Sequence, residues 1–278
     1  MRADPVPFAR LRGGDVEAVS DFCDRLHVHG YALLRFAPEA EAEVAALRSA
    51  AAAFFELPKA DKAMIGDFRF IGDTYAGYRD SVSCDSEFLE VHTIRAGGTY
   101  PPLANPAGMS EVAAALHRRL DGMARYLLKL LAAHLGIDAQ ALLAPLDPPV
   151  RAELAVLDRE GEELSSSVLR VCHYRAQPED GGGDGSVDGG AAIAATRSGD
   201  GEAKEEEEVL FDAHTDSSLL TLSTLCPRAP GLQLQDGGEW LSVERFEGVE
   251  VGWVRVRVRV RVWGSGSGLG FRLGLGLG

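Results

Sequence analysis

The stretch that decides the fold is Leu210-Phe-Asp-Ala-His-Thr-Asp-Ser-Ser-Leu-Leu-Thr-Leu, residues 210–222. It places His214 and Asp216 two residues apart at the start of a strand-rich run. Residues i and i+2 of a strand project from the same face, so an imidazole nitrogen and a carboxylate oxygen can meet one ion. Pro230-Gly-Leu-Gln-Leu and Gly238-Glu-Trp-Leu-Ser-Val follow, and these short apolar segments between turn residues predict further strands around the pair.

The pair has a metal-binding interpretation and a chance interpretation. Two histidines and one carboxylate on one side of an ion leave its other side open, which is the arrangement of non-haem Fe(II) sites. The chain offers His214 and Asp216 as two of those three ligands, and no histidine follows Asp216. His-x-Asp triplets also arise by chance, but the apolar segments that follow this one favour the ligand interpretation. Asp212 is expected to be a turn residue, or a residue that supports the ligands, rather than a ligand itself.

The first half of the chain predicts helices with a few strands. Asp15 caps a helix that Gly30 ends, and Pro38 begins another that runs to about Leu57. The strongest apolar periodicity predicts a helix over 110–135, with Ser110 as its cap. Strands are expected at 31–36 and 87–94, and a loop at 66–80.

From Arg151 onward the pattern predicts strands at 151–158, 167–175, 209–213, 218–225, 231–235 and 240–243. Helices followed by many strands predict an α+β fold with a jelly-roll core, truncated, and buttressed by the N-terminal helices. We therefore divide the chain into an N-terminal region over 1–150, a partial jelly roll over 151–248 and a tail over 249–278.

Two segments have a composition unlike the rest. Residues 179–208 carry ten acids and two bases, a net charge of −8, and are glycine-rich, so they predict a disordered insertion rather than an acidic docking segment. The tail contains a strict Val-Arg repeat from Val254, followed by Gly264-Ser-Gly-Ser-Gly and a Gly-Leu repeat. It is a genuine edge strand, a basic interaction tail, or translated non-coding sequence, and we favour the third interpretation because the repeats begin where the fold is still incomplete.

Composition limits the classes of function. The chain has 278 residues and a formal net charge of −14, which makes nucleic acid and anionic membranes poor partners. No apolar run is long enough to span a membrane, and no signal segment is evident, so a cytoplasmic protein is expected. Four scattered cysteines without a Cys-x-x-Cys pair predict reduced thiols. A monomer is expected.

The remaining histidines are expected to be structural. His27 and His29 form a His-x-His at a predicted helix end, where contact with the helix dipole is a better interpretation than metal binding. His173 should point away from Tyr174 by strand alternation, and His92 is a minor candidate for the site. His117 and His134 lie on the long helix and are expected to be partly exposed. Trp240 is expected to pack on the sheet.

The chain resembles the isopenicillin N synthase-like, 2-oxoglutarate/Fe(II)-dependent dioxygenase superfamily from about Pro5 to Glu247. The N-terminal markers are Phe22 to Gly30-Tyr-Ala-Leu-Leu, Phe54-Phe-Glu-Leu-Pro with Asp61-Lys62, and Gly77-Tyr78. Leu169-Arg-Val-Cys-His-Tyr-Arg resembles the strand with the family's Asn-x-Tyr-Pro signature, and 210–243 resembles the first half of its catalytic jelly roll.

The resemblance implies specific roles. His214 and Asp216 would be iron ligands, and Tyr174 would reach a carboxylate of 2-oxoglutarate, although Cys172 and Arg175 replace the family's Asn and Pro. The family's second histidine ligand and its Arg-x-Ser have no counterpart here. The implied activity is hydroxylation or desaturation of a small organic molecule with Fe(II), 2-oxoglutarate and O2. The alternatives are a catalytically inactive truncated or mis-spliced remnant, or an oxidase that needs no 2-oxo acid.

Overall fold

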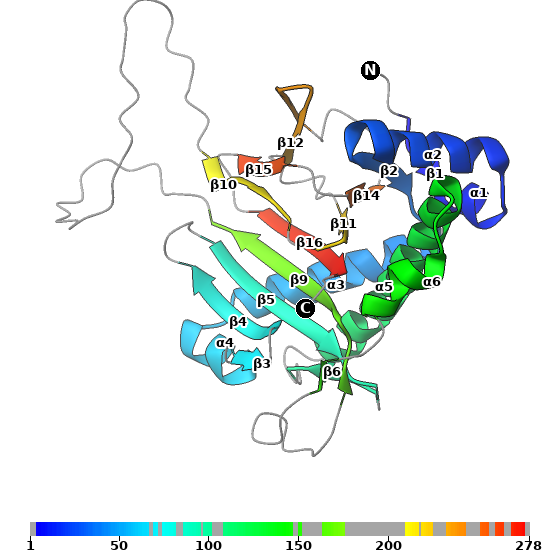
Figure 1. Cartoon of the computed structure of the whole chain (residues 1–278). Helices are drawn as coiled ribbons and strands as arrows, with labels where there is room; N and C mark the ends of the chain where they lie inside the picture. The colour runs from blue at the N-terminus through cyan, green and yellow to red at the C-terminus, as the bar shows by residue number, and fades with distance from the viewer. Residues whose placement is uncertain are drawn as a thin grey trace, which may run out of the picture.

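The computed structural model describes residues 4–66, 69–71, 74–81, 86–95, 97–101, 108–146, 150–151, 163–175, 209–216, 218–224, 232–242, 251–255, 259–263 and 268–275 (Figure 1). The predicted insertion 179–208 and most of the predicted strand 151–158 lie outside these residues. The helices are α1 (Phe8–Arg12), α2 (Val16–His29), α3 (Pro38–Phe55), α4 (Lys59–Gly66), α5 (Met109–Leu135) and α6 (Ala139–Leu143), and Ala144–Leu146 form a 3-10 helix.

Most of the predicted helix ends are confirmed. The Asp15 carboxylate accepts a hydrogen bond from the Ala18 backbone N–H at 3.1 Å, and Gly30 ends α2 with φ of 74°, a left-handed conformation that favours glycine. The predicted Ser110 cap is wrong, because α5 begins one residue earlier after Gly108. The Ser110 hydroxyl instead lies 2.7 Å from the Thr99 hydroxyl, which ties the helix to β6.

The strands form one large sheet and two smaller ones. The large sheet has the order β1-β2-β14-β11-β16-β9-β5-β4-β3, with β6 paired to β5. The second sheet has the order β10-β15-β12-β13, and β7 pairs with β8. The bounds are β1 (Val6–Pro7), β2 (Tyr31–Arg35), β3 (Arg69–Ile71), β4 (Thr74–Ser81), β5 (Ser86–Thr93), β6 (Thr99–Tyr100), β7 (Val150–Arg151), β8 (Glu163–Leu164), β9 (Ser167–Tyr174), β10 (Val209–Thr215), β11 (Leu220–Thr224), β12 (Leu232–Asp236), β13 (Glu239–Ser242), β14 (Val251–Arg255), β15 (Arg259–Trp263) and β16 (Gly268–Leu275).

The order of strands agrees with the α+β prediction. From β9 to β12 successive strands alternate between the large sheet and the second sheet, and β14, β15 and β16 alternate again. The expected loop at 66–80 is wrong, because Arg69–Ile71 and Thr74–Ser81 pair as β3 and β4.

Residues of the repetitive tail supply three of these strands. In the large sheet β14 lies between β2 and β11, and β16 lies between β11 and β9. In the second sheet β15 lies between β10 and β12. The tail is therefore paired with both sheets, whereas its origin as native or non-coding sequence stays a prediction.

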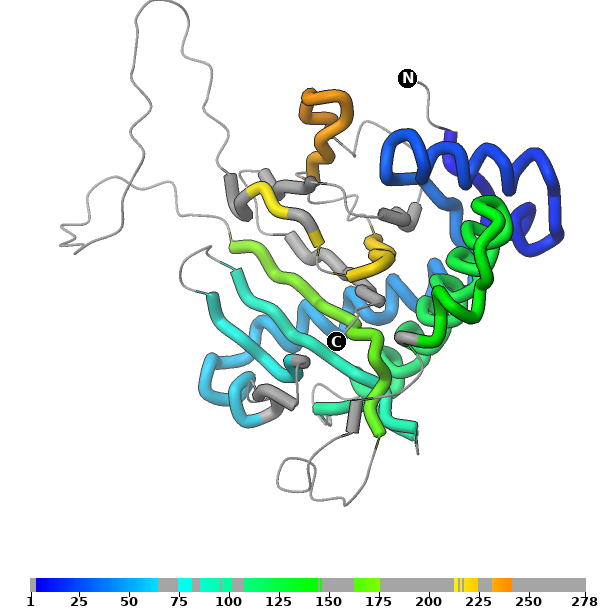
Figure 2. Tube along the Cα trace, viewed as in Figure 1, coloured from blue at the N-terminus to red at the C-terminus, as the bar shows by residue number. Residues whose placement is uncertain are grey.

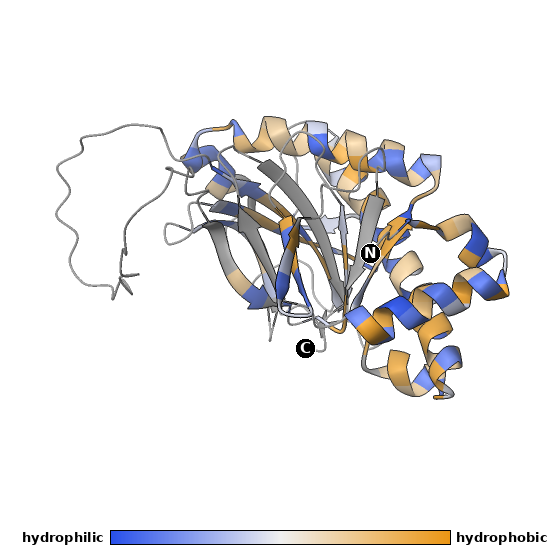
Figure 3. Cartoon of the chain, turned by 90° about the horizontal axis from the view of Figure 1, so that it is seen from above, coloured by the Kyte–Doolittle hydropathy of each residue, from blue (hydrophilic) through white to orange (hydrophobic). Residues whose placement is uncertain are grey.

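The helices cover one face of the large sheet. Figure 1 shows α3 and α5 lying along this face, and Figure 3 shows apolar and polar residues alternating along the helices. The sheet contributes alternate apolar residues to the shared core: Leu89, Val91, Leu169, Val171, Leu220 and Leu222. The spacing of these residues leaves the residues between them on the opposite face of the sheet.

A buried polar network joins α5 to the start of β9. His117 is 1% exposed, so its predicted exposure is wrong; the residue lies on the apolar stripe of α5. Its Nε2 donates to the Ser167 carbonyl at 2.9 Å, and its Nδ1 lies 3.4 Å from the Thr93 hydroxyl. Burial lowers the pKa of His117 from 6.5 to about 4.

This pKa shift predicts sensitivity to acid. The unfolded chain binds a proton at His117 below about pH 6.5, but the folded chain does not until about pH 4. The free energy of unfolding should therefore fall as the pH falls, by about 2 kcal/mol between about pH 7 and about pH 5. Urea unfolding at the two pH values measures it. His117→Gln should lose this pH dependence, whereas His134→Gln, on the same helix, should keep it.

Candidate functional site

The predicted ligand pair lies at the end of β10. The Nε2 atom of His214 is 3.4 Å from the Oδ1 atom of Asp216, and the two side chains are 28% and 14% exposed. The side chains therefore face each other, as i and i+2 spacing in a strand predicts. Because both side chains are partly exposed, solvent can reach them. The side chain of Asp212 lies outside the described residues.

The register of the β10–β15 pair determines which residues of β15 lie opposite His214 and Thr215. His214 pairs with Val260 of β15 and Thr215 with Arg259, after a register shift between Phe211 and His214. A bulge of this kind re-aims side chains locally, and bulges are common beside functional sites. Val260 is thus the residue of the neighbouring strand that lies opposite His214.

Tyr174 occupies the last position of β9. It is 7% exposed and packs with Phe88 and Cys172 on the same sheet and with Leu232 of β12 on the other sheet. The side chain therefore lies between the two sheets. In the second sheet, β15 alone separates β12 from β10, the strand of His214.

A complete three-ligand site is absent from the described part of the chain. Within the described residues, no group of three or more His, Cys, Asp or Glu side chains is arranged to hold a metal ion. His214 and Asp216 fit two positions of an iron site by the chemistry of their donor atoms. The described residues do not offer the third.

The other histidines have structural partners. His29 Nδ1 lies 3.2 Å from Asp236 Oδ1, and the Tyr31 hydroxyl donates to the other oxygen at 3.2 Å, so the β12–β13 hairpin (orange in Figure 2) is tied to the end of α2. His92 is buried, and its ring nitrogens lie 3.0 and 2.8 Å from the carbonyls of Ser165 and Tyr75. These contacts do not support a place for either histidine in the site. The partial exposure predicted for His134 is confirmed, with 29% of its side chain exposed.

A buried cluster of charged side chains lies on the face of the large sheet opposite to Tyr174. The Glu87 carboxylate, 2% exposed, accepts hydrogen bonds from Lys62 at 2.5 Å, from Tyr78, and from His173 at 3.0 Å. Arg175 Nη2 lies 3.0 Å from the same carboxylate. His173 thus points away from Tyr174, as strand alternation predicts. The cluster joins α4, β4, β5 and the end of β9.

The cluster stabilises the charged form of Glu87. Burial alone would raise the pKa of this carboxyl, but the hydrogen bonds from His173, Lys62 and Tyr78 outweigh it and lower the pKa. Burial, followed by the hydrogen bond to Glu87, raises the pKa of the Tyr78 phenol. This role of Glu87 was not predicted from the sequence. Its only signal was an acid on the face of β5 that also carries the buried Leu89 and Val91.

Removing the Glu87 carboxylate should destabilise the fold. Glu87→Ala leaves the Lys62 ammonium, whose side chain is 7% exposed, without its carboxylate. The free energy of unfolding should fall by about 3–5 kcal/mol, measured by urea denaturation near neutral pH. Glu43→Ala is the matched control, because Glu43 pairs with an Arg119 side chain that is 40% exposed. Its loss should cost about 1 kcal/mol or less. Equal effects of the two substitutions would contradict the prediction.

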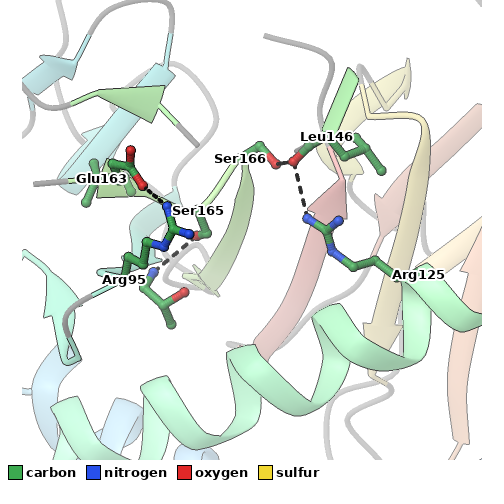
Figure 4. Close-up of a pocket in the computed structure, with 8 residues that line it drawn as sticks. Arg95, Arg125, Leu146, Glu163, Ser165 and Ser166 are labelled. Carbon is green, nitrogen blue, oxygen red and sulfur yellow. Dashed lines mark hydrogen bonds and ion pairs between the residues drawn. The ribbon is translucent and has the colours of Figure 1, made fainter. Parts of the chain in front are cut away.

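A separate polar pocket of 280 Å³ lies at the other end of β9. Figure 4 shows Arg95 paired with Glu163 at 2.5 Å, and Arg125 and Ser166 both donating to the Leu146 carbonyl, at 3.2 and 2.6 Å. The length of β9 separates this pocket from Tyr174 by roughly 23 Å. The pocket is therefore distinct from the site around His214, Asp216 and Tyr174.

Solved structures of three other proteins share this fold. A full-length Neurospora crassa protein in complex with alpha-KG aligns with a TM-score of 0.68 at 16% identity, covering 98% of this chain and 83% of that one. A 2OG-Fe(II) oxygenase family protein of Caulobacter crescentus aligns with a TM-score of 0.66 at 19% identity, covering 98% and 86%. The rice dioxygenase for auxin oxidation aligns with a TM-score of 0.63 at 18% identity, covering 99% and 83%.

The comparison shows that this chain shares the fold of these proteins, at sequence identities of 16–19%. No protein-family model matches the chain, and no curated protein matches it. Within the described residues, no helix combines the length and the apolar composition needed to cross a membrane.

Proposed function

We propose that the chain is a member of the non-haem Fe(II), 2-oxoglutarate-dependent oxygenases that act on a small organic molecule by hydroxylation or desaturation. The observation that carries this proposal is the facing His214–Asp216 pair, with 3.4 Å between Nε2 and Oδ1, on a strand of an oxygenase-like fold. We also propose that the alternating strands β9 to β16 close a jelly roll around the site, and that the protein is a cytoplasmic monomer.

Each residue would have a distinct task. His214 and Asp216 would bind the iron, and Tyr174, between the sheets, would donate its hydroxyl to a carboxylate of 2-oxoglutarate. Bound Fe(II) with 2-oxoglutarate would supply the activation of O2 that attack on a C–H bond requires. The protein's own part is to hold ligands on one side of the ion, to orient the cosubstrate and to limit access of water.

A second candidate function follows from the incomplete ligand set. We propose as the alternative that the chain as written is a catalytically inactive remnant, truncated or mis-spliced, because the described residues do not provide a third ligand. Two ligands would bind Fe(II) more weakly than three. An oxidase without a 2-oxo acid is a third candidate with less support, since it also needs the missing ligand.

Turnover separates the proposals. The full chain, incubated with Fe(II), 2-oxoglutarate and O2, should form succinate if the site is active, and His214→Ala and Asp216→Ala should abolish this formation. Absence of succinate, together with weak Fe(II) binding, would support the inactive remnant. Tight Fe(II) binding without consumption of 2-oxoglutarate would favour the oxidase.

The register between β10 and β15 also predicts a gain of affinity. Directly opposite residues of an antiparallel pair share one face, with Cβ atoms about 5 Å apart. Because an imidazole at the position opposite His214 would add a nitrogen ligand, Val260→His should tighten Fe(II) binding, measured by anaerobic titration calorimetry. The matched control is Val262→His on the same strand, because Val262 pairs with Phe211. No gain, or the same gain in both variants, would contradict the assigned register.

A further inference from the structure

The polar pocket at the start of β9 is built from separate segments of the chain. Arg95 follows β5 and Glu163 lies in β8, and the two line one side of the pocket (Figure 4). Arg125 of α5, Ser166 and Leu146 line the other side. The volume of 280 Å³ is close to the lower end of the range of ligand pockets, about 300 Å³, so a ligand of this pocket is a small molecule.

Backbone hydrogen bonds hold the Arg95–Glu163 side of the pocket in place. The Arg95 N–H donates to the Glu163 carbonyl at 3.0 Å, and the Ser165 N–H donates to the Thr93 carbonyl at 2.9 Å. A β-bridge joins the same two segments between these bonds. The side chains of Arg95 and Glu163 therefore start from fixed, neighbouring backbone positions, and the Nη1 and Oε2 atoms lie 2.5 Å apart.

The opposite side of the pocket is held by hydrogen bonds within the protein. Arg125 Nε donates to Asp121 Oδ2 at 2.9 Å, so the charge of this arginine is matched by a carboxylate. Arg125 Nη2 and the Ser166 hydroxyl both donate to the Leu146 carbonyl. Because the Ser166 hydroxyl gives its hydrogen to this carbonyl, its oxygen is left as an acceptor for a ligand.

The Arg95–Glu163 pair keeps donors and an acceptor that the protein does not use. Among the residues that the structure describes, Arg95 contacts Glu163 through Nη1, and its Nε and Nη2 have no partner. Glu163 uses Oε2 in this contact, and within the same residues its Oε1 has no partner. The Arg95 side chain is 77% exposed and that of Glu163 is 26% exposed, so a ligand can reach both. The pair thus offers positive donors directly beside a negative acceptor.

The charges around the pocket indicate the class of ligand. Arg95 and Arg125 are each positive, and Glu163 and Asp121 are each negative, so the four charges cancel. A simple anion beside Arg95 is repelled by the neighbouring Glu163, and a simple cation beside Glu163 is repelled by Arg95. A molecule with one carboxylate and one ammonium group meets an opposite charge at both positions, and each contact is a charge-assisted hydrogen bond.

We propose that this pocket is a binding site for a small zwitterion of the size of an amino acid. The carboxylate of the ligand accepts hydrogen bonds from Arg95, and its ammonium group donates to the Oε1 atom of Glu163. A polar substituent of the ligand donates to the hydroxyl oxygen of Ser166. The site lies roughly 23 Å from Tyr174, the length of β9, and does not depend on the proposed iron ligands or on the proposed activity.

Three matched probes test the site on the full chain without iron. L-serine carries both charged groups, 3-hydroxypropionate lacks the ammonium group, and ethanolamine lacks the carboxylate. Ligand-observed NMR titration measures the three dissociation constants, because this method also covers weak binding. L-serine should bind at least about tenfold more tightly than either analogue, since each analogue lacks one of the two charge-assisted contacts.

Two substitutions should remove the two preferences separately. Glu163→Gln should abolish the advantage of L-serine over 3-hydroxypropionate, and Arg95→Gln should abolish its advantage over ethanolamine. Arg119→Gln, which removes another exposed arginine paired with a glutamate, Glu43, is the matched control and should leave all three affinities unchanged. Loss of folding would affect both preferences alike, so it cannot produce this pattern.

Several results would overturn the site. These are the absence of L-serine binding, equal affinity for L-serine and either analogue, equal effects of Arg119→Gln and the two pocket substitutions, or L-serine binding that both pocket substitutions leave unchanged. Because no iron is present, failure of succinate formation leaves the zwitterion site standing. Equally, failure of L-serine binding leaves the iron-dependent activity to its own test.

Discussion

The position of β9 is the constraint on which the rest of the structure depends. This strand pairs with β5 on one side and β16 on the other, and its residues alternate between two environments. Leu169 and Val171 enter the core beneath the helices, while Arg170, Cys172 and Tyr174 face the second sheet. A register shift of one residue would exchange these faces and bury Arg170 against α5. The Glu87 cluster opposes such a shift, because His173 and Arg175 connect the end of the strand to Lys62 and Tyr78.

This constraint also explains which features the sequence predicted. Elements with a strong period or a specific cap were predicted well: Asp15, Gly30 and Pro38 mark helix ends by local chemistry, and the strands at 167–175 and 209–213 follow from their apolar pattern. His214 and Asp216 could be predicted to face each other because their relation is local. An extended strand is sufficient to bring the two side chains to one face, independently of the rest of the fold.

Features that depend on distant segments could not be predicted in this way. His117 belongs to the apolar stripe of α5, but its burial depends on Thr93 and Ser167, far away in the chain. Serine is a residue type that often caps helices, but the Ser110 hydroxyl instead contacts the Thr99 hydroxyl of β6. Residues 66–80 are rich in glycine and aromatic residues, yet Arg69–Ile71 and Thr74–Ser81 within them pair as strands, and the second of these also pairs with β5. The Glu87 cluster similarly combines residues from four elements.

The tail presents the opposite case, since its pattern is regular but carries little information about register. A Val-Arg or Gly-Leu repeat is unchanged by a slip of two residues, so the alternation of faces is kept in several registers. β16 also contains three glycines, Gly268, Gly270 and Gly274, and glycine in a strand weakens the specification of its position. The strands that should complete the site, β15 opposite His214 and β16 opposite Tyr174, are therefore those whose sequence specifies their position least. The strands that carry His214, Tyr174 and Arg170 are thus specified by their own sequence, whereas the tail supplies backbone pairing. Among the described residues, no third His, Cys, Asp or Glu joins the His214–Asp216 pair. Metal binding by the proposed His214–Asp216 pair would therefore depend on neighbouring strands whose register the sequence specifies poorly.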